Sequence, residues 1–186
     1  MRSGELPRSK KRRYAARGMG GDHDQAWCAR QSDLFHTASI TPIPAHAQTA
    51  DPDADRSAVE KLMHDYFQAY SRGDMEAVMK FINVPFVVSG PKGFRAFTTG
   101  DEPMAWYTNF RDAAVKQGYA KTEWLDLGVK ILGQSYAIAE GTYVRYKTDG
   151  TELNRSGGTY LLSKVDGVWK IGLNIGYPVK DAFKLE

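Results

Sequence analysis

The spacing of apolar residues changes near Lys121, and this change constrains the fold more than any other feature of the sequence. Before it, apolar side chains recur every three to four residues, as in amphipathic helices. After it, they alternate with polar side chains, as in strands that cover a core with one face. A chain with helices first and hairpin strands later is expected to fold as an α+β domain, with its helices on one face of an antiparallel sheet.

Capping patterns and one-sided apolar residues predict two helices between Ser57 and Phe81. Ser57 and Glu60 match a capping box, in which each side chain bonds to a backbone N–H at the start of a helix. Gly73 is placed as the glycine that ends this helix, and Asp74 then caps a short second helix. The first helix is amphipathic because its apolar residues share one face: Val59, Leu62, Met63, Tyr66, Phe67 and Tyr70.

Two short strands and a third helix are predicted next, followed by four strands. Residues 85–97 indicate two strands around a Gly/Pro turn, and Thr99 with Glu102 predicts a helix that Gly118 ends. Its expected buried stripe comprises Met104, Tyr107, Phe110, Ala114 and Val115. The later strands are predicted at 123–132, 135–146, 155–164 and 168–177, with hairpin turns at Asp149-Gly150 and Asp166-Gly167. The predicted domain therefore spans residues 55–178, with a short tail at 179–186.

Residues 1–54 have no sustained period and are rich in Gly, Pro, Ser, Asp and Arg, so we expect a disordered leader. Within it, Ala45-His46-Ala47 matches the A-x-A site that signal peptidase cuts, but the apolar h-region of a secretory signal is missing upstream. Either the match is accidental, or the leader comes from a faulty translation start or frameshift ahead of an exported protein. We expect a periplasmic or secreted protein if the site is genuine, and a cytoplasmic one otherwise.

The positive charge of the chain lies in this leader. Residues 1–50 hold eight Lys/Arg and four Asp/Glu, whereas residues 51–186 hold 17 and 18. Phosphate backbones require clustered cations, and a membrane-spanning helix requires a run of about 18 apolar residues. We therefore predict no nucleic-acid partner and no membrane insertion for the domain. Cys28 and His64 form no metal-ligand cluster, and no glycine-rich phosphate cradle precedes a helix, so we predict no metal or other cofactor.

The order of these elements resembles the NTF2-like superfamily, with its SnoaL-like and DUF4440-like members. Arg72-Gly73-Asp74 after the first helix and Gly-Val-Trp-Lys-Ile at 167–171 carry the resemblance. It implies a cone, in which a curved antiparallel sheet wraps around the long first helix beside two further helices and an internal pocket. Members include ketosteroid isomerase, scytalone dehydratase, limonene epoxide hydrolase, polyketide cyclases and non-catalytic association domains. Such patterns specify a fold and leave the activity open.

Tyr66 occupies the first-helix position that supplies the oxyanion-hole phenol in ketosteroid isomerase, as the resemblance implies. The base position of the isomerase falls at Ser89 or Gly90, and its second acid falls near Gly158. Both carboxylates are absent, so only the phenol carries over. Tyr66 also suits a core position on the apolar face, with its hydroxyl bonded locally.

Other candidates for chemistry are weaker. His64 could act as a general base at neutral pH, but helical geometry turns it away from the apolar face. The epoxide-hydrolase pattern needs an Asp-Arg-Asp trio, for which only Asp126, Arg145 and Arg155 are available. No spacing singles these three out, and strand geometry favours outward charges on the sheet.

Three functions stay open. The first is a homodimeric protein that binds a small hydrophobic molecule in the cone pocket. The second is a lyase, isomerase or cyclase for a polyketide- or steroid-like substrate, with Tyr66 as acid or oxyanion donor. The third is a non-catalytic association domain. The expected ligand contacts, chosen as aromatic or polar residues that could line a pocket, are Tyr70, Trp106, Tyr107, Phe110, Tyr143, Arg145, Tyr160 and Asn174.

Overall fold

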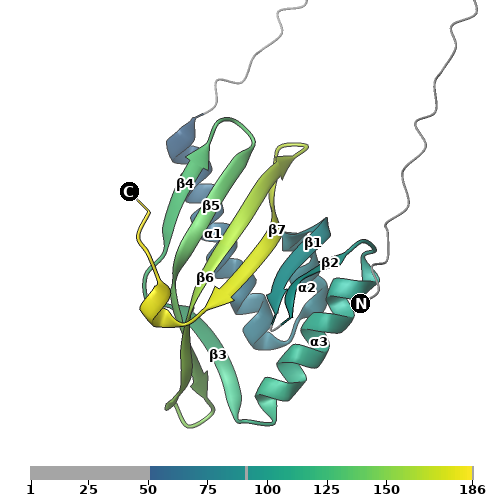
Figure 1. The fold of residues 1–186 in the computed structure, drawn as a ribbon, viewed down its shortest axis with the longest axis vertical. Helices are drawn as coiled ribbons and strands as arrows, with labels where there is room; N and C mark the ends of the chain where they lie inside the picture. Colours follow the sequence, from purple (N-terminus) through teal and green to yellow (C-terminus); the bar gives the residue numbers. More distant parts are fainter. Residues whose placement is uncertain (1–50, 91, 186) are drawn as a thin grey trace, which may run out of the picture. The chain divides into compact units, whose positions relative to one another are not determined.

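The computed structural model describes residues 51–90 and 92–185. Figure 1 shows the elements in this part of the chain. They are three α-helices, seven strands and one short 3-10 helix: α1 (Pro52–Arg72), α2 (Met75–Phe81), β1 (Ile82–Gly90), β2 (Gly93–Phe97), α3 (Asp101–Val115), β3 (Tyr119–Trp124), β4 (Gly128–Leu132), β5 (Tyr136–Lys147), β6 (Glu152–Val165), β7 (Val168–Tyr177) and η1 (Val179–Asp181). The leader up to residue 50, with the A-x-A sequence at 45–47, lies outside the described residues.

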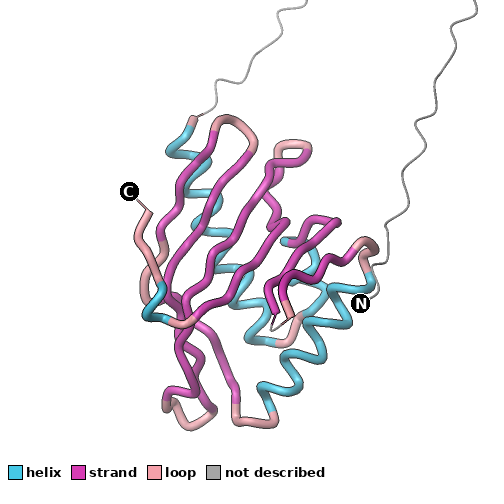
Figure 2. The backbone as a smooth tube through the Cα atoms, in the orientation of Figure 1, coloured by secondary structure: helices cyan, strands magenta, loops and turns pink. Residues whose placement is uncertain are grey.

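The strands form one curved, open sheet in which β5, β6 and β7 are the long central strands (Figure 2). The order is β2-β1-β7-β6-β5-β3, and β4 pairs with the remaining length of β5. Neighbouring strands are antiparallel except β1 and β7, which pair in parallel with Val88 opposite Asn174. The predicted α+β fold with three helices and a curved sheet is confirmed. The parallel pair was not predicted, because β1 and β7 lie far apart in the sequence.

Helix α1 packs against one face of the sheet, with most of its contacts on β3 and β4. Its predicted apolar face is buried, since each of its six residues is at most 9% exposed. Removing this apolar area from water is the main force that holds the helix on the sheet. The same face also forms one wall of the pocket described below.

The start of α1 differs from the prediction. Asp51 is the N-cap, and its carboxylate accepts hydrogen bonds from the backbone N–H groups of Asp53 and Ala54. Pro52 suits the first helical position, where a missing N–H costs nothing. Ser57 lies inside the helix and donates to the carbonyl of Asp53, so the predicted capping box is wrong. Helix α1 therefore begins at Pro52, before the start predicted from Ser57.

The junction between α1 and α2 forms as predicted. Gly73 ends α1 in the left-handed region, with φ 78°. Its N–H bonds to carbonyls of the last turn, and glycine adopts this conformation without the strain that a Cβ brings. Asp74 caps α2 by accepting a hydrogen bond from the N–H of Ala77.

Helix α3 buries less of its surface than predicted. Tyr107 is 2% exposed, whereas Phe110 and Val115 are 42% and 44% exposed. This difference arises because α3 packs mainly on α2 and β3, while Phe110 borders the pocket described below. The predicted start is close, since the Glu102 carboxylate accepts from the backbone N–H groups of Thr98 and Thr99.

The strand predicted at 123–132 is two strands, β3 and β4, and both pair with β5. Between them, the Asp126 side chain accepts a hydrogen bond from the N–H of Thr142 at 2.6 Å. This carboxylate replaces a ladder carbonyl, so the strand bends at this point. The bend also brings the Asp126 carbonyl against Gly141, where it would lie 2.1 Å from an added Cβ.

After β7 the chain returns across the sheet face opposite α1 (Figure 1). Helix η1 contacts β6, and the N–H of Phe183 donates to the buried carboxylate of Glu140 at 3.3 Å. The hydroxyl of Tyr177 donates to the same carboxylate at 2.9 Å. Within residues 51–90 and 92–185, no helix is both long and apolar enough to cross a membrane.

Candidate functional site

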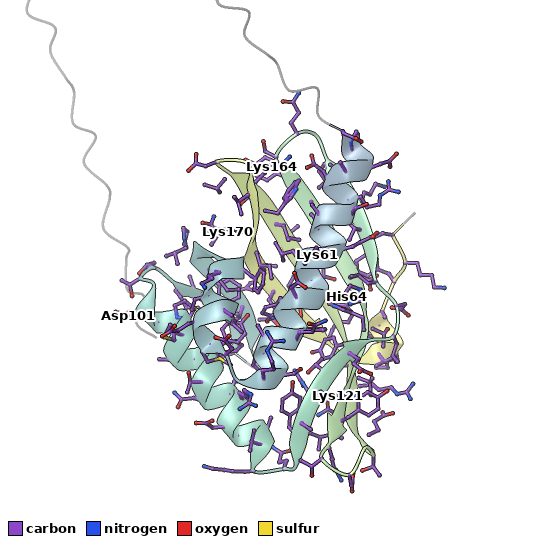
Figure 3. All side chains as sticks on the ribbon, turned by 180° about the vertical axis from the view of Figure 1, so that it is seen from behind. Lys61, His64, Asp101, Lys121, Lys164 and Lys170 are labelled. Atoms are coloured by element: carbon purple, nitrogen blue, oxygen red, sulfur yellow. The ribbon has the colours of Figure 1, made fainter. Side chains whose placement is uncertain are left out.

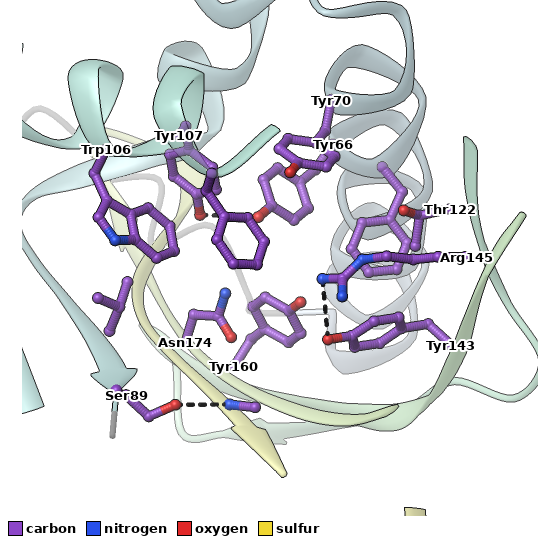
Figure 4. A pocket seen from close by; sticks show the side chains of 15 residues that line it. Tyr66, Tyr70, Ser89, Trp106, Tyr107, Thr122, Tyr143, Arg145, Tyr160 and Asn174 are labelled. Atoms are coloured by element: carbon purple, nitrogen blue, oxygen red, sulfur yellow. Dashed lines mark hydrogen bonds between the residues drawn. The ribbon is translucent and has the colours of Figure 1, made fainter. Parts of the chain in front are cut away.

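A pocket of about 430 Å³ lies between α1, α3 and the sheet (Figure 4). All nine residues that the sequence singled out line it: Tyr66, Tyr70, Trp106, Tyr107, Phe110, Tyr143, Arg145, Tyr160 and Asn174. Their roles in catalysis or ligand binding stay predictions. These side chains come together because they lie on regular faces of α1, α3, β5 and β6, with Asn174 added from β7.

Helical spacing explains the two helical walls of the pocket. Tyr66 and Tyr70 are four residues apart on α1, and Trp106 and Phe110 are four apart on α3, so each pair shares one face. On β5, Tyr143 and Arg145 are two residues apart and point to the same side of the sheet. Tyr160 and Asn174 are register partners on β6 and β7, which places them side by side at the floor.

Four further residues that matter to the pocket were not predicted: Phe67, Val88, Thr122 and Gly176. Phe67 was placed on the apolar face of α1, and it stacks on Trp124 with ring centroids 4.5 Å apart. Val88 and Gly176 belong to the paired strands β1 and β7. Period-two alternation within β1 could have indicated Val88, since Phe86 and Val88 are both buried.

The hydroxyl groups of Tyr66 and Tyr107 form a hydrogen bond of 2.8 Å within the pocket wall. Burial raises the pKa of Tyr66 well above its ordinary value, and it also raises the pKa of Tyr107. Both phenols therefore stay protonated at neutral pH. Because one hydroxyl donates to the other, the pair has one proton left to donate to an oxygen of a bound molecule, and neither phenol is suited to act as a base.

Two more tyrosines contribute buried hydroxyl groups. Burial raises the pKa of Tyr70 and of Tyr160, while the positive charge of Arg145 acts in the opposite direction on both. Within the described residues, the buried hydroxyl of Tyr70 has no hydrogen-bond partner. Tyr70 and Tyr160 are thus protonated phenols close to the Arg145 guanidinium.

Arg145 supplies the positive charge of the pocket. Its Cζ lies 5.4 Å from the ring centroid of Phe110 and 5.1 Å from that of Tyr143, so the guanidinium stacks on both rings. Its hydrogen bonds are long, at 3.5 Å to the Tyr143 hydroxyl and 3.4 Å to the Asn154 amide oxygen. The close-up in Figure 4 shows the guanidinium turned into the pocket.

The positions of the two isomerase carboxylates carry no acid. Ser89 and Gly90 line the pocket, and the Ser89 Oγ accepts a hydrogen bond from the N–H of Gly176 at 2.9 Å. A Cβ on Gly158 would meet the rings of Tyr143 and Tyr160 at 3.1 Å, so those rings fill the space that a second acid would need.

The weaker candidates lie outside the pocket, apart from Arg145. His64 is exposed on the outward side of α1, near Lys61 (Figure 3). Asp126 is exposed and bonds to the backbone of Thr142, and Arg155 pairs with Glu152 at the surface. Among the residues placed by the structure, no group of three or more His, Cys, Asp or Glu side chains could hold a metal ion.

Solved structures share this fold at low sequence identity. An NTF2-like protein with a cystatin-like fold from Novosphingobium aromaticivorans is 16% identical, with a TM-score of 0.58 over 69% of this chain and 84% of that chain. A candidate dehydratase of the NTF2-like family from Streptomyces avermitilis is 16% identical, with a TM-score of 0.52 over 69% and 99% of the two chains. The association domain of CaMKII from C. elegans is also 16% identical, with a TM-score of 0.53 over 68% and 97%.

These structures establish the fold and leave the activity open, since such distant folds serve unrelated functions. A comparison with curated proteins found no match. The model of the family described as NTF2-like protein (DUF6841) matches residues 54–175. Because that match covers well over half of the sequence, the protein belongs to the NTF2-like family DUF6841.

Proposed function

We propose that this domain binds a small, largely apolar molecule in the pocket between α1, α3 and the sheet. The observation that carries the proposal is the aromatic lining of a space of about 430 Å³. Pockets for small molecules are typically of this size and mostly apolar, with a few polar groups that fix the ligand. Here the polar groups are the tyrosine hydroxyls, Ser89, Thr122, Asn174 and Arg145.

Contacts between the aromatic rings support the lining of the pocket. Tyr66 packs edge-on against Tyr107 and Tyr160, with centroid distances of 6.1 Å. Trp106 stacks on Phe110 at 5.3 Å. Such edge and stacked contacts are favourable geometries for aromatic pairs. A rigid lining supports binding because less conformational entropy is lost when the ligand enters.

Naphthamide, a neutral bicyclic aromatic amide, is a suitable probe. We expect it to change the tryptophan fluorescence of the full chain saturably, because Trp106 lines the pocket. Gly176→Leu should weaken this binding at least tenfold, since a Cβ at Gly176 meets no atom within 4 Å and the longer side chain can fill the space. The matched change Gly172→Leu, on the same strand and outside the lining, should leave it unchanged. Absence of saturable binding, or equal binding by Gly176→Leu, would contradict the proposal.

A second candidate is a lyase, isomerase or cyclase that acts on a polyketide- or steroid-like substrate. The hydrogen bond between Tyr66 and Tyr107 favours it, because a paired phenol can donate to a developing oxyanion. Tyr70, Arg145 and Asn174 would assist. The described lining residues include no Asp, Glu or His that could take up a proton, so binding is the better-supported proposal. If Tyr66→Phe left the turnover of every converted substrate unchanged, this catalytic role would be excluded.

We also propose that the protein is a homodimer joined through the sheet face opposite α1. Tyr136 and Leu161 are 63% and 42% exposed on the strands β5 and β6. Sedimentation should give twice the monomer mass, and Leu161→Lys should give monomers. If ligand binding failed while dimers persisted, an association domain would describe the protein better.

A further inference from the structure

We propose that the natural ligand of this pocket is an apolar carboxylate, most of whose body contacts the aromatic lining while its carboxylate pairs with Arg145. This inference rests on the proposed binding function and adds the charge of the ligand. The carboxylate partner is inferred from the side chains around Arg145, since a buried or half-buried cation normally faces an anion.

Within the described lining of the pocket, no acidic side chain lies beside Arg145. The other lining residues are aromatic, aliphatic, hydroxyl, amide or glycine residues, and Arg145 forms no ion pair with any carboxylate of the described chain. By contrast, Arg155 on the neighbouring strand pairs with Glu152 at 2.7 Å. Arg145 thus carries a charge that the protein positions but does not neutralise.

The present contacts of the Arg145 guanidinium orient it and leave its N–H groups able to form stronger hydrogen bonds. Stacking on Phe110 and Tyr143 fixes its plane, while its hydrogen bonds of 3.4 and 3.5 Å to neutral oxygens lie beyond the usual range for strong bonds. A guanidinium presents two parallel N–H groups that match the two oxygens of a carboxylate. Little reorganisation is therefore needed before an acid binds.

Tyr160 provides a second donor beside Arg145. Its hydroxyl makes no hydrogen bond to any residue in the described part of the chain, and Figure 4 shows it directed toward the guanidinium. The positive charge of Arg145 acts on Tyr160, which supports their proximity. A neutral phenol next to a guanidinium is a donor set suited to a carboxylate.

A second cation near the phenols, Arg111, already donates hydrogen bonds to backbone carbonyls. The charge of Arg111 also acts on Tyr70, but its Nε and Nη2 donate to the carbonyls of Tyr70 and Ser71 at 2.9 Å. Residues 51–186 carry a net charge of about −1, from 17 basic and 18 acidic residues, so no general positive field attracts acids. Selectivity for an anion would thus depend on Arg145 itself.

The test compares naphthoate with naphthamide, which share shape and ring area and differ in charge. Binding of each probe to the full chain is followed by tryptophan fluorescence, for wild type, Arg145→Gln, Arg145→Lys and Arg155→Gln. We expect wild type to bind naphthoate at least tenfold more tightly than naphthamide. Arg145→Gln should remove this preference and keep naphthamide binding, Arg145→Lys should keep part of it, and Arg155→Gln should match wild type.

The outcomes separate the two proposals. Equal wild-type affinity for both probes would overturn the carboxylate ligand while the binding function stands. Failure of both probes to bind would overturn the binding function and this inference with it. If Arg145→Gln weakened both probes equally, Arg145 would only support the Phe110 wall, and the inference would again be wrong. Thermal unfolding of each variant shows whether the fold is intact, and Arg145→Lys preserves the test if Arg145→Gln does not fold.

Discussion

The hydroxyl groups of Tyr66 and Tyr107 lie 2.8 Å apart, so one buried hydrogen bond joins the second half of α1 to the middle of α3. The two residues are 41 positions apart in the sequence. This bond sets the distance between the two helical walls of the pocket, and it satisfies two hydroxyl groups that are removed from water.

Breaking this bond on one side should destabilise the domain. Tyr107→Phe leaves the Tyr66 hydroxyl buried without its partner, which should lower the free energy of unfolding by about 1–3 kcal/mol. Tyr66→Phe should act similarly. The double variant should cost less than the sum, because no unpaired hydroxyl remains. Urea unfolding of all four proteins measures this coupling, and strictly additive costs would contradict it.

The end of α1 should depend on Arg111 of α3. Its guanidinium donates to the carbonyls of Tyr70 and Ser71 in the last turn of α1, each at 2.9 Å. Arg111→Met should therefore cost about 1.5–3 kcal/mol of stability, as expected for hydrogen bonds from a charged group. The exposed Arg72→Met serves as a control in urea unfolding. Equal stability of the two variants would rule out this role.

A side chain at Gly73 should cost more stability while Arg111 is present than in its absence. Its φ of 78° strains any residue with a Cβ, and that Cβ would lie 2.9 Å from the Arg111 guanidinium. Gly73→Ala should thus cost about 1–3 kcal/mol. In the Arg111→Met background the cost should fall, since only the backbone strain remains. An unchanged cost in both backgrounds, measured by thermal unfolding, would show that the guanidinium contact is irrelevant.

Stability at acidic pH should depend on Asp55. Its carboxylate accepts hydrogen bonds from Lys164 and from the Trp169 indole, the latter at 3.1 Å. The bond to Lys164 contributes most to lowering the pKa of Asp55 below its ordinary value of 3.8. The folded state therefore releases this proton more readily than the unfolded state. The resulting stability is complete above the unfolded pKa and is lost as pH falls through the folded pKa.

Urea unfolding between about pH 7 and pH 2 tests this dependence. Wild type should exceed Asp55→Asn in stability at neutral pH, and the difference should shrink as the pH falls below about 4. Asp53→Asn, an exposed change on the same helix, should leave the wild-type pH profile in place. A difference between wild type and Asp55→Asn that stays constant with pH would contradict the role of the charge.

Gly141, the one glycine of β5, should be difficult to replace. An added Cβ would lie 2.1 Å from the carbonyl oxygen of Asp126, which is backbone and cannot rotate away. Gly141→Ala should cost about 3 kcal/mol or more, as overpacking does in a tight interior. Gly176→Ala, where an added Cβ meets no atom within 4 Å, should be nearly neutral. Thermal unfolding compares them, and equal melting temperatures would contradict this prediction.

Local sequence determined most of the elements. The buried face of α1, the Gly73 and Asp74 junction, and β7 from Val168 to Tyr177 follow the prediction closely. Asp166 and Gly167 both have positive φ in the turn before β7, as the hairpin pair requires. These features are encoded within a few residues, because periodicity, caps and turn conformations depend on near neighbours in the chain.

Tertiary structure decided the boundaries and the exposure. The strand expected at 123–132 is divided because Asp126 bonds to Thr142, which lies 16 residues away. Phe110 is 42% exposed because α3 packs mainly on α2 and β3, which leaves this ring at the border of the pocket. Sequence spacing carries no information on such partners.

The sequence by itself determined which residues could serve a pocket, namely aromatic and polar residues on regular faces of the helices and strands. Only the tertiary structure decided that Tyr66 meets Tyr107, that Tyr160 lies beside Asn174, and that Arg145 faces them without a carboxylate partner in the described residues. Periodicity fixes the direction of a side chain relative to its own element. The packing of distant elements determines which other side chains it contacts, and the chemistry of this pocket depends on those contacts.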